Sequence, residues 1–138
     1  MIQSDDTSVL SKFKDVPTYK RVLLIEERIS KAPKKAVAEV KKYADTVAIT
    51  RGDIVEVSSY FTTHMTNVVR QFQKANVSVF VYVLRNEYIT LAFDYFSDPT
   101  VEIATFVEAA GVDGLITEFP GTASTYLSMC YNLNLMLL

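Results

Sequence analysis

The chain is poor in the residues that build metal centres and disulfide frameworks. Among its 138 residues there is a single cysteine, Cys130, and a single histidine, His64. One cysteine excludes an internal disulfide framework and a cysteine-rich zinc site, and one histidine excludes a His–His metal motif within the chain. With only four glycines, a glycine-rich phosphate loop is not expected, and no P-loop, G-x-G-x-x-G, H-E-x-x-H or G-x-S-x-G motif occurs.

The chain also lacks an excess of one charge and any long apolar run. Fourteen Lys and Arg residues against sixteen Asp and Glu give a net charge of −2, so no nucleic-acid partner is expected. No stretch approaches the roughly 18 apolar residues of a membrane-spanning helix. The opening MIQSDD has neither a basic region nor an apolar run, so no secretory signal is expected there. A hydrophobic content of 49% and this length predict one folded domain with a core.

Short β-branched runs alternate with longer stretches at helical spacing. The predicted strands cover residues 1–4, 22–25, 46–50, 77–84 and 112–117. Helices are predicted after Asp6, from Pro33, after Thr66, from Pro99 to a stop at Gly111, and from Thr122 to about Leu127. Residues 54–60 are β-branched but have no clear partner, so their structure stays ambiguous.

This alternation, with strands apolar on both faces, predicts a parallel sheet with helices outside. Two architectures fit the pattern, an open doubly wound sheet or part of a (β/α)8 barrel. A complete barrel needs roughly 250 residues and eight strands, and this chain supplies only five predicted strands.

Ligands of parallel α/β folds meet the carboxyl ends of the strands. That rule selects, in chain order, Gln3, Ser4, Glu26, Glu27, Arg51, Arg85, Asn86, Glu87 and Glu118. Arg85 follows eight largely apolar residues, so it either binds a phosphate with its guanidinium or forms an ion pair with Glu87 or Glu118. For Glu118 three roles stay open: general base, metal ligand, or half of that ion pair.

The other charged candidates favour structural roles. Glu26 and Glu27 precede a Lys-rich helix, where pairing with Arg28, Lys31 or Lys34 is expected. Arg51 precedes Gly52 and fits a solvated turn better than a phosphate ligand. His64 falls in a polar loop, where a lone histidine is seldom functional. The aromatic residues between 88 and 96 either line a ligand pocket or form a lid segment that packs on its own barrel.

Three segments resemble one known family. Residues 112–120, VDGLITEFP, resemble the closing strand of the glycerophosphodiester phosphodiesterase family, typically V-D-G-I-I-T-D-Y-P. Residues 79–87 fall where that family has its seventh strand, and residues 2–4 resemble its fourth. The strings RNEYITLAFDYFSDP and IQSDDTSVLSKF resemble the plant glycerophosphodiester phosphodiesterase-like branch. The resemblance covers Ile2 to about Tyr126.

The resemblance implies an α/β fold that is a partial (β/α)8 TIM barrel, strands four to eight with outer helices. It implies hydrolysis of a glycerophosphodiester to an alcohol and glycerol 3-phosphate in lipid and glycerol metabolism, with a divalent metal, Ca or Mg, expected for the complete domain. It implies substrate-binding roles for Gln3, Tyr82, Arg85 and Glu118, where Tyr82 replaces a family Trp. Members of this branch are secreted or lipid-anchored at the cell surface.

The departures from the family limit the expected activity. The catalytic His–Arg pair, the Glu-x-Asp metal ligands, a second His and a further acidic ligand belong to the family's first three strands, which have no match in this chain. No catalytic residue or metal ligand is therefore assigned here. We expect a barrel portion at residues 1–127 and an unrelated tail at 128–138 that lies loosely on the surface. Two functions stay open: an enzyme portion that is inactive alone, or a non-catalytic half-barrel that self-associates through its open sheet edges or docks on another chain.

Overall fold

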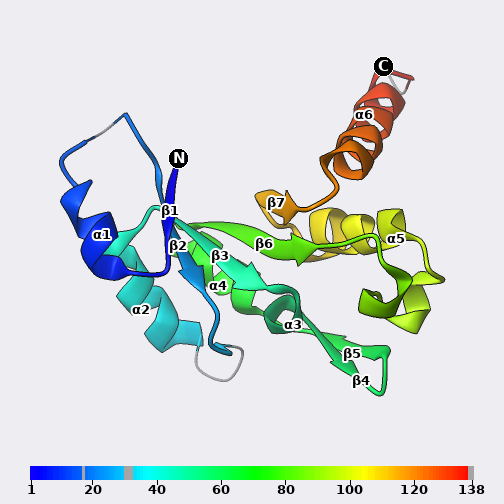
Figure 1. Ribbon diagram of the computed structural model, residues 1–138, viewed down its shortest axis with the longest axis horizontal. Helices are drawn as coiled ribbons and strands as arrows, with labels where there is room; N and C mark the ends of the chain where they lie inside the picture. Colours follow the sequence, from blue (N-terminus) through cyan, green and yellow to red (C-terminus); the bar gives the residue numbers. More distant parts are fainter. Residues whose placement is uncertain (17, 30–32, 137–138) are drawn as a thin grey trace.

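The main layer of the protein is a five-stranded parallel sheet (Figure 1). The computed structural model describes residues 1–16, 18–29 and 33–136. The sheet order is β1-β2-β3-β6-β7, and its pairings are all parallel. The strands are β1 (Ile2–Ser4), β2 (Arg21–Ile25), β3 (Thr46–Thr50), β6 (Ser78–Leu84) and β7 (Gly114–Thr117). The predicted strands and their sequential order are confirmed.

The crossover helices begin and end close to where the sequence predicts. They are α1 (Thr7–Lys12), α2 (Pro33–Tyr43), α4 (Val68–Lys74) and α5 (Pro99–Ala104), which continues as a π-helical stretch over Thr105–Ala110. Asp98 caps α5 by accepting a hydrogen bond from the Thr100 N–H at 2.8 Å. Gly111 ends the helical stretch at φ 71°, a left-handed conformation that favours glycine.

The core lies between the helices and the outer face of the sheet. Two phenylalanines dominate it, Phe72 of α4 and Phe106 of the π-helical stretch, which are 0% and 1% exposed. They belong to one cluster with the alternate residues of the central strands, Val47, Ile49, Val79 and Val81. Because side chains alternate between the two faces of a strand, the odd-numbered residues of β3 and β6 face the helices.

The inner face of the sheet carries a row of paired positions. Leu24 pairs with Ala48, Ala48 with Phe80, and Phe80 with Gly114. The small residues Ala48 and Gly114 therefore lie on either side of the large Phe80 ring. A β-carbon on Gly114 would lie 2.6 Å from Phe80 Cε1, so the ring occupies the space that a side chain there would need. Alternating large and small residues are typical of a barrel interior, and the sheet is half of such a barrel, with β1 and β7 at its edges.

A β-hairpin occupies the segment that the sequence left ambiguous. One helical turn, α3 (Arg51–Ile54), leads into β4 (Val55–Ser58) and β5 (Phe61–Met65), which pair antiparallel. The turn residues Ser59 and Tyr60 both have positive φ, 51° and 66°, the pattern of a type I′ turn. The hairpin projects beyond the carboxyl end of β3 (Figure 1).

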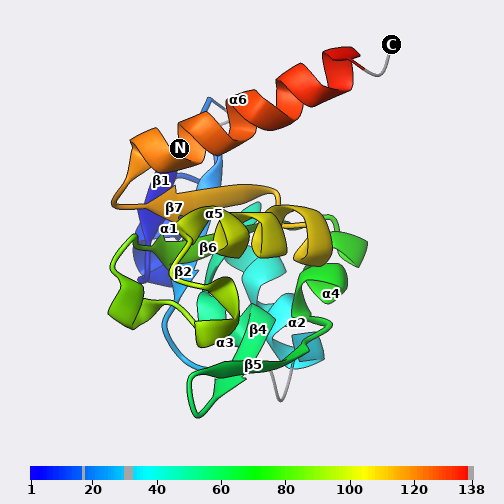
Figure 2. The same ribbon diagram turned by 90° about the vertical axis from the view of Figure 1, so that its right-hand side faces the viewer.

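The last helix is longer than predicted. α6 spans Pro120–Met136, whereas the sequence predicted an end near Leu127. No proline or glycine follows Gly121, so nothing terminates the helix there. The carboxyl-terminal half of α6 extends away from the rest of the molecule (Figure 2). Within the described residues, no helix combines the length and apolar character needed to cross a membrane.

Candidate functional site

A cavity of about 380 Å³ lies where β3 and β6 end, and we call it the mouth cavity. Its lining residues are Thr50, Arg51, Gly52, Tyr82, Val83 and Arg85. Thr50 and Tyr82 are direct partners across the two strands, which sets both strand ends at one level. The charged groups of this lining are two arginines, so the cavity is suited to an anion.

Arg85 and Glu118 form an ion pair at the edge of this cavity. Arg85 Nε and Nη2 donate to Glu118 Oε1 at 2.9 and 2.6 Å. Both side chains are about half exposed, 47% and 49%. The ion pair with Glu118, one of the roles left open for Arg85, is confirmed, and Arg85 is also among the residues that line the cavity.

Tyr82 reaches across the sheet from β6. Its hydroxyl donates to the carbonyl oxygen of Ile25 at the end of β2, at 2.9 Å. Burial raises the pKa of the Tyr82 phenol, and the negative charges of Glu26 and Asp53 raise it further. The phenol is therefore a neutral donor at physiological pH, and Tyr82 is among the residues that line the cavity.

Arg51 is anchored, contrary to the prediction of a solvated turn residue. Its Nη1 donates to Glu102 Oε1 at 2.9 Å and to the Thr90 carbonyl oxygen at 3.1 Å. Glu102, on α5, is 3% exposed. Burial raises the pKa of the Glu102 carboxyl, and the adjacent Arg51 partly offsets that rise. The partner lies 51 positions along the chain, a contact that no local pattern indicates.

Gln3 lies apart from the other three predicted substrate-binding residues. It is exposed on β1 and pairs with Val22, which in turn pairs with Thr46 at the start of β3. Tyr82 pairs with Thr50, four residues further along β3, or roughly 13 Å at the usual strand rise. Tyr82, Arg85 and Glu118 are thus brought together, and the role of Gln3 stays a prediction.

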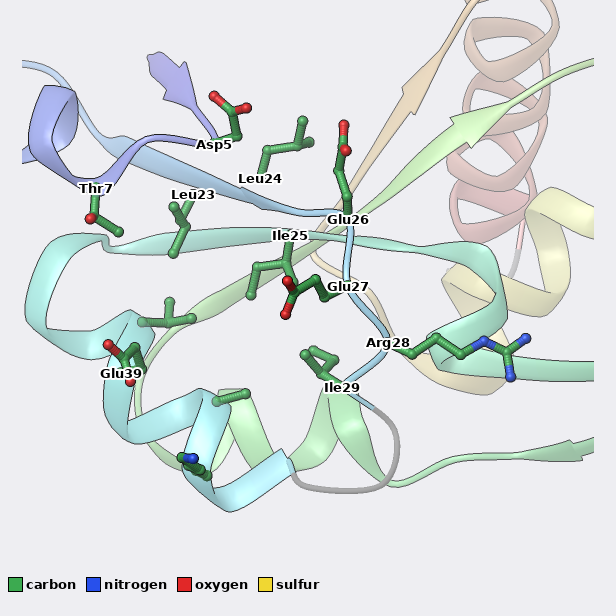
Figure 3. A pocket seen from close by; sticks show the side chains of 13 residues that line it. Asp5, Thr7, Leu23, Leu24, Ile25, Glu26, Glu27, Arg28, Ile29 and Glu39 are labelled. Atoms are coloured by element: carbon green, nitrogen blue, oxygen red, sulfur yellow. The ribbon is translucent and has the colours of Figure 1, made fainter.

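Glu26 and Glu27 border a second cavity, of about 580 Å³, between β2 and α2 (Figure 3). Figure 3 shows Leu24 and Glu26 on one side of β2 and Leu23 on the side of α2. Among the described residues neither glutamate forms an ion pair, so the predicted pairing with Arg28 or Lys34 is wrong. The third predicted partner, Lys31, lies outside the described residues.

His64 and the aromatic segment lie around the hairpin. His64 is on β5 rather than in a polar loop, and its Nδ1 is 3.8 Å from Glu56 Oε2 on β4. The residues from Tyr88 to Tyr95 include two 3₁₀ turns, and the second of them contacts β5 of the hairpin. Phe93 stacks on Tyr60 and meets Phe61 edge-on, so these aromatics hold the segment against the protein itself.

A parallel half-barrel with polar side chains gathered at the carboxyl ends of its strands defines the class of fold, which is a partial (β/α)8 barrel. The glycerophosphoryl diester phosphodiesterase family model matches residues 1–122. The chain belongs to this family.

Curated relatives come from Arabidopsis thaliana. The chain is 59% identical over 135 residues to glycerophosphodiester phosphodiesterase GDPDL7 and 58% identical over 135 residues to glycerophosphodiester phosphodiesterase GDPDL6. Each alignment covers 97% of this chain and 18% of the relative. A third, GDPDL1, is 44% identical over 91% of this chain and 16% of its own length. The chain therefore spans less than a fifth of the length of each of these three relatives.

Proposed function

We propose that this chain forms the phosphate-facing wall of a glycerophosphodiester phosphodiesterase barrel and does not hydrolyse the substrate by itself. The observation that carries the proposal is the mouth cavity, where Arg85, held by Glu118, and Tyr82 converge at the carboxyl ends of parallel strands. Family membership supplies the substrate class, a glycerophosphodiester that yields an alcohol and glycerol 3-phosphate.

Each of these side chains has a distinct task toward a phosphodiester. The Arg85 guanidinium supplies positive charge and directed N–H donors to a non-bridging phosphate oxygen. Glu118 fixes the guanidinium through two hydrogen bonds to one oxygen. Tyr82, whose hydroxyl is held by the Ile25 carbonyl oxygen, forms part of the cavity lining. None of them is a nucleophile with an adjacent base, so they bind and orient but do not start the reaction.

The divalent cation that the family implies does not fit the residues present. Among the described residues, no group of three or more His, Cys, Asp or Glu side chains converges on one point. Glu118 is engaged with Arg85. We therefore assign no reaction step to a cation bound by this chain, and the cation ligands of a complete domain come from its first three strands. The cell-surface location of the plant branch, secreted or lipid-anchored, is part of the same proposal.

The test is an enzyme-coupled assay for glycerol 3-phosphate released from a glycerophosphodiester. The 138-residue chain alone should be inactive, because productive geometry needs groups from several strand ends. Combined with the first three strands of the GDPDL7 barrel, in one chain or as a complementing fragment, it should become active. Arg85→Ala and Glu118→Ala should each lower that activity. Turnover by the chain alone that Glu118→Ala abolishes would contradict the proposal.

A second candidate function rests on the sheet edges. Within the described residues, β1 pairs only with β2 and β7 only with β6, so each keeps one unpaired side. Unpaired strand edges bind other chains. As a non-catalytic half-barrel, the chain would self-associate or dock on another chain. Light scattering at micromolar concentration should then show dimers or larger species, and a stable monomer would contradict this function.

A further inference from the structure

Arg51 shares the mouth cavity with Arg85, although it was not predicted as a phosphate ligand. Both residues line the cavity of about 380 Å³, together with Thr50 and Gly52. Arg51 also borders a neighbouring cavity of about 320 Å³, whose lining includes Glu102 and Thr90. Arg51 is 28% exposed, so its guanidinium is neither sealed in the core nor free in solvent. Two guanidinium groups at one cavity are a common arrangement for binding a phosphate group.

The hydrogen bonds of Arg51 leave part of its donor set available. Nη1 makes both of its contacts, to Glu102 Oε1 and to the Thr90 carbonyl oxygen. In the described part of the chain, Nε and Nη2 of Arg51 donate to no protein acceptor. Arg85 shows the complementary usage, with Nε and Nη2 engaged by Glu118. Each arginine is therefore fixed through some N–H groups and retains others for a ligand.

Glu102 supplies the fixed point from which Arg51 projects. This residue is 3% exposed on α5, and its carboxylate accepts a hydrogen bond from Arg51 Nη1 at 2.9 Å. A guanidinium held on one side loses less conformational entropy when a ligand binds on the other. The Thr90 carbonyl oxygen adds a second anchor on the segment that follows β6.

We infer that Arg51 is a second phosphate-binding residue of the mouth cavity and that Glu102 is the residue that positions it. The inference rests on the proposed function, because the ligand is the phosphate group of the same diester or of its product, glycerol 3-phosphate. The opposing possibility is that Arg51 only fastens the segment around Thr90 to the barrel.

The experiment is equilibrium binding of glycerol 3-phosphate to the 138-residue chain, measured by isothermal titration calorimetry at low ionic strength. Arg51→Met should weaken binding about tenfold or more, as loss of one charge-assisted contact does. Arg51→Lys should recover only part of the loss, because an ammonium lacks the planar donor fork. Arg21→Met is the matched control, since Arg21 also pairs with a carboxylate, Asp45, but lies at the amino end of β2. The Arg21→Met variant should bind glycerol 3-phosphate as tightly as the unmodified chain does.

Variants of Glu102 separate positioning from folding. Glu102→Gln keeps an acceptor for Arg51 and should retain binding, whereas Glu102→Leu removes it and should weaken binding. Arg51→Met leaves a buried carboxylate without its partner and so could unfold the protein. The double variant Arg51→Met with Glu102→Leu removes that carboxylate and provides a folded comparison. Its affinity for glycerol 3-phosphate should fall as much as that of Arg51→Met alone.

The outcomes distinguish this inference from the proposed function. If Arg85→Met loses binding while both Arg51 variants and the double variant bind normally, Arg51 is only a fastener and this inference is wrong. If Glu102→Gln and Glu102→Leu bind equally well, the positioning role of Glu102 is wrong. If the unmodified chain binds no glycerol 3-phosphate, the proposed function falls together with the inference.

Discussion

Removing Arg51 should destabilise the protein in a way that depends on pH. Arg51→Met leaves the Glu102 carboxylate, which is 3% exposed, without its cationic partner. Breaking one side of a buried ion pair costs about 3–5 kcal/mol. With a urea m-value of about 2 kcal/mol per molar, the midpoint of unfolding at pH 7.5 should fall by about 1.5–2.5 M.

The pH dependence follows from the direction of the pKa shift of Glu102. Burial raises the folded-state pKa above the unfolded value even with Arg51 present, and loss of Arg51 raises it further. A raised carboxyl pKa means that the folded state is favoured when the group is protonated. The loss of unfolding free energy caused by Arg51→Met should therefore be largest at a pH above the folded-state pKa of Glu102. It should shrink as the pH falls toward the unfolded-state pKa of about 4.3.

The assay is urea unfolding followed by circular dichroism at pH 7.5 and pH 4. Near pH 4 the remaining deficit should be about 1 kcal/mol, the value of a lost neutral hydrogen bond such as that to the Thr90 carbonyl. At pH 7.5, adding Glu102→Leu to Arg51→Met should restore most of the stability, because it removes the unpaired charge. A deficit that is the same at both pH values, or a double variant as unstable as the single one, would refute the reasoning.

Three further changes test the packing of the half-barrel. Gly114→Ala should lower the free energy of unfolding by about 1–3 kcal/mol, because its β-carbon overlaps the Phe80 ring. In urea unfolding, Gly114→Ala should cost less when Phe80→Ala is also present, and an equal cost would contradict the overlap. Tyr82→Phe should cost about 1 kcal/mol by the same method through its lost bond to the Ile25 carbonyl, and an unchanged midpoint would show that this bond contributes nothing. Removal of residues 128–138 should leave the melting temperature unchanged in scanning calorimetry, and a fall of several degrees would show that the end of α6 supports the fold.

The parallel sheet could be predicted because its information is local. The run from Val77 to Leu84 is long, β-branched and bounded by Asn76, which takes a positive φ of 62° and ends the preceding helix. Asp98 followed by Pro99 defines a helix start within two residues. Such signals repeat with every strand and helix, so the order of elements follows from the sequence alone.

The hairpin could not be predicted, because its turn lacks the usual residues. Ser59 and Tyr60 adopt positive φ where Asn or Gly is normally found. Contacts from the distant segment after β6 hold the hairpin instead. The Thr62 N–H donates to Asp94 Oδ2 at 2.6 Å, and the Phe93 N–H donates to the Tyr60 carbonyl oxygen at 2.8 Å. Tertiary contacts thus override a weak local signal.

The residues of the candidate site could likewise be predicted where the signal is local, and not where it depends on distant contacts. The rule that ligands meet strand carboxyl ends selected Arg85 and Glu118, which the structure pairs at 2.6 Å. The same rule selected Gln3, which lies level with the start of β3 because β1 is short and pairs in that register, and its role stays a prediction. Arg51 could not be assigned correctly, since its environment is created by Glu102 of α5, and only the folded chain brings the two together.

The most direct test of the central claim is where glycerol 3-phosphate binds on this chain. In nuclear magnetic resonance spectra of the ¹⁵N-labelled protein, titration with glycerol 3-phosphate should shift the resonances of Tyr82, Arg85 and Glu118 at the carboxyl ends of the strands. The resonances of Arg21 and Asp45, an ion pair at the amino ends, should stay unchanged. Shifts at the amino ends without shifts at Arg85 would contradict a phosphate-binding mouth.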